Sequence, residues 1–161
     1  MRGKLFGSQH IGFWLLGVVL FVLQEIPYMV MPMLHLENNP IMHTRETSAF
    51  LDICEKVLGF SCIALLVFVV QEHASVFSVG SGFHKVGFVL AAAALLLNYV
   101  GWSLYFVGYQ SFAIMMGFLV ALPPLYYACI GLWRGNWPLF ITGLLFEAVH
   151  FVHVYGNLRG R

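Results

Sequence analysis

The stretch Trp137–Asn157 reads Trp-Pro-Leu-Phe-Ile-Thr-Gly-Leu-Leu-Phe-Glu-Ala-Val-His-Phe-Val-His-Val-Tyr-Gly-Asn, and it predicts the class of fold. It is long and apolar enough to cross a bilayer as a helix, which takes about 20 residues. It also carries Glu147, His150 and His153 at intervals of three residues, so that Glu147 can contact His150 on one side of the helix. An ionisable group in hydrocarbon costs about 2.5 kcal/mol or more. We therefore expect these side chains to face other helices or a polar cavity.

The composition of the chain indicates an integral membrane protein. Of the 161 residues, 60% are hydrophobic and 9% are charged, whereas about 25% of the residues of a soluble domain are charged. The net charge of +1 gives no electrostatic reason to expect nucleic acid as a partner. The three cysteines lie in apolar stretches without Cys-x-x-Cys spacing, so no disulfide framework or thiolate metal site is indicated. We expect no cofactor, and we expect the lipid bilayer as the principal surroundings.

Five apolar stretches predict an all-α integral membrane protein, a five-transmembrane-helix bundle with kinked first and fourth helices. The kinks are expected at Pro27 and Pro32 and at the pair Pro123-Pro124, because proline removes a backbone N–H and clashes with the preceding turn. Residues 1–161 then form a single membrane domain, with helices expected over residues 11–34, 49–70, 83–106, 111–133 and 137–157.

The orientation of the bundle follows from the basic residues near its ends. Five crossings place the two termini on opposite sides. The N-terminal side carries one more basic residue than the other, and the first helix often dominates orientation. This comparison sets Arg2, Lys4, Lys85 and Arg134 against Arg45, Arg159 and Arg161. We therefore expect a multi-pass protein with a cytoplasmic N-terminus.

The third expected helix has a face of small and polar residues, which predicts close packing against other helices. Small residues let membrane helices approach closely. Asn98 is the member of this face that must find a hydrogen-bond partner. The face consists of His84, Gly87, Ala91, Ala94, Asn98 and Gly101.

Polar residues from four of the expected helices fall in the half of the membrane where the first helix ends. At 1.5 Å per residue they all lie within about 15 Å of that surface. Chance packing would not concentrate them in this way, so we expect a cavity that opens toward that side. The expected ligand-binding residues are Glu25, Asp52, Glu55, Asn98, Trp102, Glu147 and His150.

Three functions remain open from the residues. Glu25, Glu147 and His150 suit a protein that binds or transports a small, partly apolar or amphipathic molecule, with proton linkage. The same three residues could be general acids and bases of an intramembrane enzyme acting on an isoprenoid- or sterol-like substrate. His150 and His153 are weak candidate ligands for a metal or haem. A homo-oligomeric assembly is also open.

Overall fold

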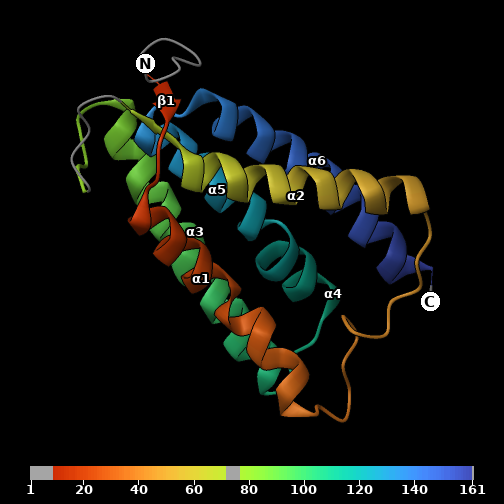
Figure 1. The fold of residues 1–161 in the computed structure, drawn as a ribbon. Helices are drawn as coiled ribbons and strands as arrows, with labels where there is room; N and C mark the ends of the chain where they lie inside the picture. The colour runs from red at the N-terminus through yellow and green to blue at the C-terminus, as the bar shows by residue number, and fades with distance from the viewer. Residues whose placement is uncertain (1–8, 72–76, 161) are drawn as a thin grey trace.

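The computed structural model describes residues 9–71 and 77–160, and most of them are helical (Figure 1). The predicted all-α architecture is therefore confirmed, whereas Arg2, Lys4 and Arg161 lie outside the described residues. In chain order the helical elements are α1 (Leu15–Val30), the 3-10 helix η1 (Met31–Leu34), α2 (Ala49–Phe68), α3 (Phe83–Phe106), α4 (Phe112–Ile114), the π-helical η2 (Met115–Val120), α5 (Leu122–Arg134) and α6 (Trp137–Arg159).

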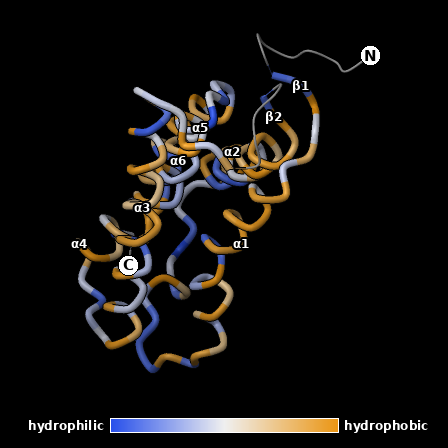
Figure 2. Tube along the Cα trace, turned by 90° about the vertical axis from the view of Figure 1, so that its left-hand side faces the viewer, coloured by the Kyte–Doolittle hydropathy of each residue, from blue (hydrophilic) through white to orange (hydrophobic). Residues whose placement is uncertain are grey.

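Within the described part of the chain, four helical stretches are long and apolar enough to cross a membrane, by length and composition. These are Leu15–Leu34, Phe83–Phe106, Phe112–Arg134 and Trp137–Arg159. The helix α2 has 20 residues but carries three charged residues near its start, namely Asp52, Glu55 and Lys56. Figure 2 shows hydrophobic residues along most of each helix and hydrophilic residues gathered in the connecting segments.

Two predicted helix ends are wrong, because a short sheet forms there instead. The strand β1 (Gln9–Ile11) pairs antiparallel with β2 (Val69–Gln71), with Gln9 opposite Gln71. The pairing continues through the N–H of Gly12, which donates to the Phe68 carbonyl at 2.9 Å. Consequently α1 begins at Leu15 rather than residue 11, and α2 ends at Phe68 rather than residue 70. Glycine is unfavourable inside a helix, and β-branched valine is favourable in strands. An apolar run alone, however, does not distinguish a helix from a strand.

Small residues bring α5 into close contact with two neighbouring helices. A Cβ atom at Gly87 of α3 would lie 2.4 Å from the backbone nitrogen of Trp133, and one at Gly143 of α6 would lie 2.7 Å from that of Ala128. Both positions therefore need glycine. Five members of the predicted small-residue face of α3 are buried, which confirms that the face packs inward: Gly87, Ala91, Ala94, Asn98 and Gly101.

The prolines of α5 leave two carbonyl groups of η2 without helical donors. In η2 the hydrogen bonds run five residues back, as from the Ala121 N–H to the Met116 carbonyl at 3.0 Å. In this pattern the carbonyls of Phe118 and Leu119 would accept from residues 123 and 124, which are prolines and have no N–H. A buried carbonyl without a donor is destabilising.

Side chains of two other helices supply the missing donors. The Asn98 amide of α3 donates from Nδ2 to the Phe118 carbonyl at 2.8 Å, and the Tyr28 hydroxyl of α1 donates to the Leu119 carbonyl at 2.7 Å. Gln24 in turn donates from Nε2 to Oδ1 of Asn98 at 3.2 Å. Asn98 and Gln24 are fully buried. These bonds link α1 and α3 to the π-helical segment.

In Figure 1, α1 and α3 diverge from the pair formed by α2 and α6 toward the C-terminal ends of α1 and α3. The loop of residues 35–48 joins the end of η1 to the start of α2 across the open side of this angle. At the opposite end the helices converge, and Asn136 donates from Nδ2 to the Leu65 carbonyl at 2.9 Å. There Gln9 also donates from Nε2 to the Gly135 carbonyl at 2.6 Å.

Replacement of Ala91 or Ala94 by leucine should destabilise the protein by about 1–3 kcal/mol, because both alanines are buried and extra methyl groups would overpack the interface. Thermal unfolding in detergent measures the effect. Ala92→Leu is the matched control, because Ala92 is exposed on the same helix. Equal stability of all three variants would contradict the packing.

Asn98→Leu should destabilise by about 1–3 kcal/mol, because it leaves the Phe118 carbonyl buried without its donor. Tyr28→Phe should have an effect of the same sign through the Leu119 carbonyl. Ser103→Ala is the control, since the exposed Ser103 hydroxyl bonds only one turn back to the Tyr99 carbonyl. Chemical unfolding in detergent would contradict this explanation if Asn98→Leu behaved like Ser103→Ala.

Candidate functional site

A cavity of about 280 Å³ lies between α2, α6, η2, the end of α1 and the loop of residues 35–48. One part of its wall is polar and ionisable, and the other part is apolar. The polar part is formed by Thr44, Glu55, His150, His153 and Asn157, and Tyr28 lies on the wall as well. The apolar part is formed by Ile41, Leu119, Val120, Val154 and Leu158. Such a wall suits a molecule that has one polar group and an apolar body.

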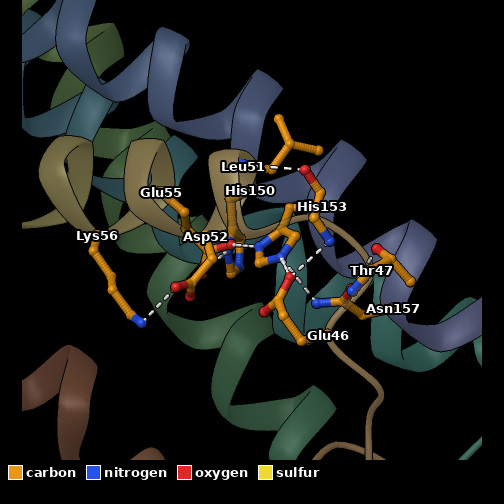
Figure 3. A network of polar contacts seen from close by, with 10 residues as sticks. Glu46, Thr47, Leu51, Asp52, Glu55, Lys56, His150, His153 and Asn157 are labelled. Carbon is orange, nitrogen blue, oxygen red and sulfur yellow. Dashed lines mark hydrogen bonds and ion pairs between the residues drawn. The ribbon is translucent and has the colours of Figure 1, made fainter.

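His153 is the centre of the polar part, as Figure 3 shows. Its side chain is 4% exposed. Its Nδ1 atom is bonded to Oε2 of Glu55 on α2, and its Nε2 atom lies 2.8 Å from Oε1 of Glu46 in the loop. The ring thus lies between two carboxylates from different segments. It joins α6 to both α2 and the loop.

Asn157 adds a second connection between α6 and the loop. Its Oδ1 atom accepts hydrogen bonds from the backbone N–H and the hydroxyl of Thr47, at 2.9 and 2.6 Å. Its Nδ2 atom lies 3.0 Å from Nε2 of His153. Because His153 and Asn157 are four residues apart on one helix, they face the loop together. The loop that forms one wall of the cavity is therefore attached to α6 at two residues that lie one helical turn apart.

Glu55 connects this cluster to the cavity wall at His150. Its Oε1 atom lies 3.1 Å from Nδ1 of His150. The spacing along α6 predicted a contact between His150 and Glu147. Because α2 packs against α6, Glu55 of α2 lies beside His150 instead. Asp52 pairs with Lys56 at 2.7 Å, with the Lys56 side chain 64% exposed. Asp52 does not line this cavity.

Of the residues expected to bind a ligand, Glu55 and His150 line this cavity, and the others lie elsewhere. Glu25 accepts a long hydrogen bond of 3.5 Å from the Tyr127 hydroxyl. Trp102 is buried edge-on against Tyr28, with the ring centroids 4.8 Å apart. Asn98 is engaged with the π-helical segment, and Oε2 of Glu147 is buried without a hydrogen-bond partner among the described residues. The three acid–base candidates thus do not meet in this cavity.

Three residues of the cluster were not predicted from the sequence to belong to a site, namely Glu46, Thr47 and Asn157. Glu46 and Thr47 lie in a loop without helical spacing, so no periodicity assigns them a partner. The four-residue spacing of His153 and Asn157 is the one available signal, because it places both on the same helix face. The sequence does not indicate which segment of the chain contacts that face.

No group of three or more His, Cys, Asp or Glu side chains within residues 9–71 and 77–160 is arranged to hold a metal ion. His150 and His153 are instead engaged with carboxylates. Imidazole and carboxylate groups that bond one another are suited to holding and exchanging protons.

Comparisons with protein-family models, with curated protein sequences and with solved structures gave no match.

The attachment of the loop at Glu46 should depend on pH. Hydrogen bonds from His153 and the Ser48 N–H lower the pKa of the Glu46 carboxyl. A lowered pKa contributes stability that is present above the ordinary value of about 4.3 and is lost as the pH falls through the lowered value. Hydrogen exchange of the amides of Thr47 and Ser48 measures the attachment. At pH 6 these two amides should exchange more slowly in the wild type than in Glu46→Gln. On strong acidification the exchange rates of the two proteins should become equal.

Glu37→Gln is the control for this measurement, because Glu37 is an exposed residue of the same loop. It should leave the protection of both amides unchanged at each pH. Equal protection of wild type and Glu46→Gln at pH 6 would show that the ion pair does not hold the loop.

Proposed function

We propose that this protein is a five-helix integral membrane protein that binds a small, partly apolar molecule in the cavity between α2, α6 and η2. The observation that carries the proposal is the combination of an apolar wall with a Glu55–His150–His153 end in a cavity of about 280 Å³. Transport of the bound molecule, with proton linkage through these groups, is the activity that we propose for the site.

The outward surface of α2 supports a membrane location for this helix, although its first turns are charged. Its exposed hydrophobic residues follow one another at three- and four-residue spacing, which makes an apolar stripe on the side away from α6. The stripe consists of Phe50, Ile53, Val57 and Phe60, which are 58% or more exposed, and Phe68, eight residues further on, is 52% exposed. Glu55 faces α6 instead, through His150 and His153.

The ends of α2 also support a crossing by this helix. Its last residues continue into β2, which pairs with the strand β1 that precedes α1. Its first residues follow the loop that leaves η1. The helix therefore leads from the loop after η1 back to the strand that precedes α1. If α1 crosses the membrane, a crossing by α2 returns the chain to the side on which α1 begins.

An acid–base enzyme is the second candidate function, and the pair of Glu55 and His150 favours it. A carboxylate beside one ring nitrogen of a histidine can orient the ring as a general base, and Oε1 of Glu55 lies 3.1 Å from Nδ1 of His150. The apolar wall would then take a lipid-like substrate. The other two acid–base candidates, Glu25 and Glu147, do not line the cavity, so we rank this function below binding and transport.

Labelling of single cysteines tests the five crossings. His43→Cys and Ser81→Cys, in a background without Cys54, Cys62 and Cys129, place thiols in the loops before and after α2. Because α2 crosses the membrane in this proposal, a membrane-impermeant reagent should label the two from opposite sides of sealed vesicles. Labelling of both from the same side would leave only four crossings.

Cavity filling tests the binding site. Val154→Phe should displace a co-purifying small molecule, because Val154 lies on the cavity wall, and mass spectrometry of the gently purified protein measures occupancy. Val152→Phe is the matched control, since Val152 is exposed on the same helix. Equal occupancy in both variants would place the ligand elsewhere.

A further inference from the structure

We propose that the molecule bound in the cavity carries a protonated amine, which is held at Glu55. This inference rests on the proposed binding function and adds the chemical class of the ligand. The carboxylate of Glu55 and the apolar wall opposite it are the two features that carry the inference.

The charge of the polar end favours a cation over an anion. The cluster consists of two carboxylates, Glu46 and Glu55, and two imidazoles, His150 and His153. Its formal charge is −2 with both rings neutral, −1 with one ring protonated and zero with both protonated. An anionic group would meet a carboxylate in each of these states, and like charges repel each other.

The basic side chains of the surrounding elements do not change this balance. Among residues 9–71 and 77–160, no lysine or arginine lines the cavity, and Arg45 of the loop is exposed. Lys56 of α2 is paired with Asp52 at 2.7 Å. The guanidinium of Arg159 on α6 lies over the Tyr155 ring at 4.6 Å from its centroid. Both basic groups are thus engaged outside the cavity wall.

Glu55 can accept a further hydrogen bond at each oxygen. Oε1 lies 3.1 Å from His150, and Oε2 is bonded to His153. A carboxylate oxygen has two lone pairs, so each atom keeps one acceptor position. An ammonium group offers three donors and can use these positions.

The rest of the wall selects an organic cation rather than a metal ion. The described side chains form no metal-type group of ligands. Leu119, Val120, Val154 and Leu158 instead offer hydrocarbon. The volume of about 280 Å³ equals that of roughly nine water molecules at about 30 Å³ each. It therefore fits a short alkyl or aryl amine.

Three probes of equal length test the class of ligand, namely hexylammonium, hexanol and hexanoate. Each is titrated at pH 7 into the protein in phosphatidylcholine nanodiscs, and binding is measured by saturation-transfer NMR against empty nanodiscs. We expect hexylammonium to bind at least tenfold more tightly than hexanol, and hexanoate to bind most weakly. Equal binding of hexylammonium and hexanol, or a preference for hexanoate, would overturn the amine and leave the binding function intact. Binding of none of the three would overturn both.

Variants locate the ammonium. Glu55→Gln should reduce hexylammonium binding to the level of hexanol while hexanol binding persists, which also reports that the cavity has formed. Asp52→Asn is the matched control, because it removes a carboxylate of the same helix that does not line the cavity. An equal loss in both variants, or none in Glu55→Gln, would refute Glu55 as the acceptor. If Glu55→Gln does not fold, the order of the three probes in the wild-type chain decides the proposal.

A last comparison distinguishes a free amine from the headgroup of a lipid. The hexylammonium titration is repeated in nanodiscs that contain phosphatidylethanolamine. Competition by this lipid would support its headgroup ammonium as the occupant. Unchanged hexylammonium affinity would support a free amine.

Discussion

The arrangement of the bundle depends on two carbonyl groups that have no helical donor. Pro123 and Pro124 remove the N–H groups that would bond to Phe118 and Leu119. Water cannot satisfy a carbonyl inside a packed core, so the donors must come from side chains of other helices. Asn98 and Tyr28 provide them, and each can do so only if its own helix lies at the right height beside η2. The missing N–H groups at Pro123 and Pro124 thus constrain where α1 and α3 lie relative to η2. The same constraint places Tyr28 on the cavity wall.

The face through which α3 packs was predictable from the sequence, because its small residues follow a regular spacing. The small-residue face of α3 is readable without knowledge of its partner, since any close neighbour requires small residues at three- and four-residue intervals. The sheet of β1 and β2 was not readable in this way. Ile11, Val69 and Val70 are apolar residues next to apolar helices, and only the pairing of distant segments shows that they are strands.

The candidate site was predictable in part, for a related reason. Glu55 and His150 stand out because a charged residue in an apolar helix needs a reason to be there. Their membership of one cluster could not be derived, because it depends on the contact between α2 and α6. Glu147 illustrates the limit. It is the nearest acid to His150 along the helix, yet His150 faces Glu55 of another helix. Local spacing identifies groups that can meet, whereas packing decides which of them do.

The pairing of β1 with β2 has a consequence for the order of events during synthesis. The two strands are separated by the whole of α1, the loop of residues 35–48 and α2. A chain made from its N-terminus onward therefore exposes the backbone of Gln9–Ile11 long before Val69–Gln71 exists. Closure of this long loop carries an entropic cost, and the start of α1 must come to lie beside the end of α2 for the strands to meet. The sheet thus forms late and joins the start of α1 to the end of α2.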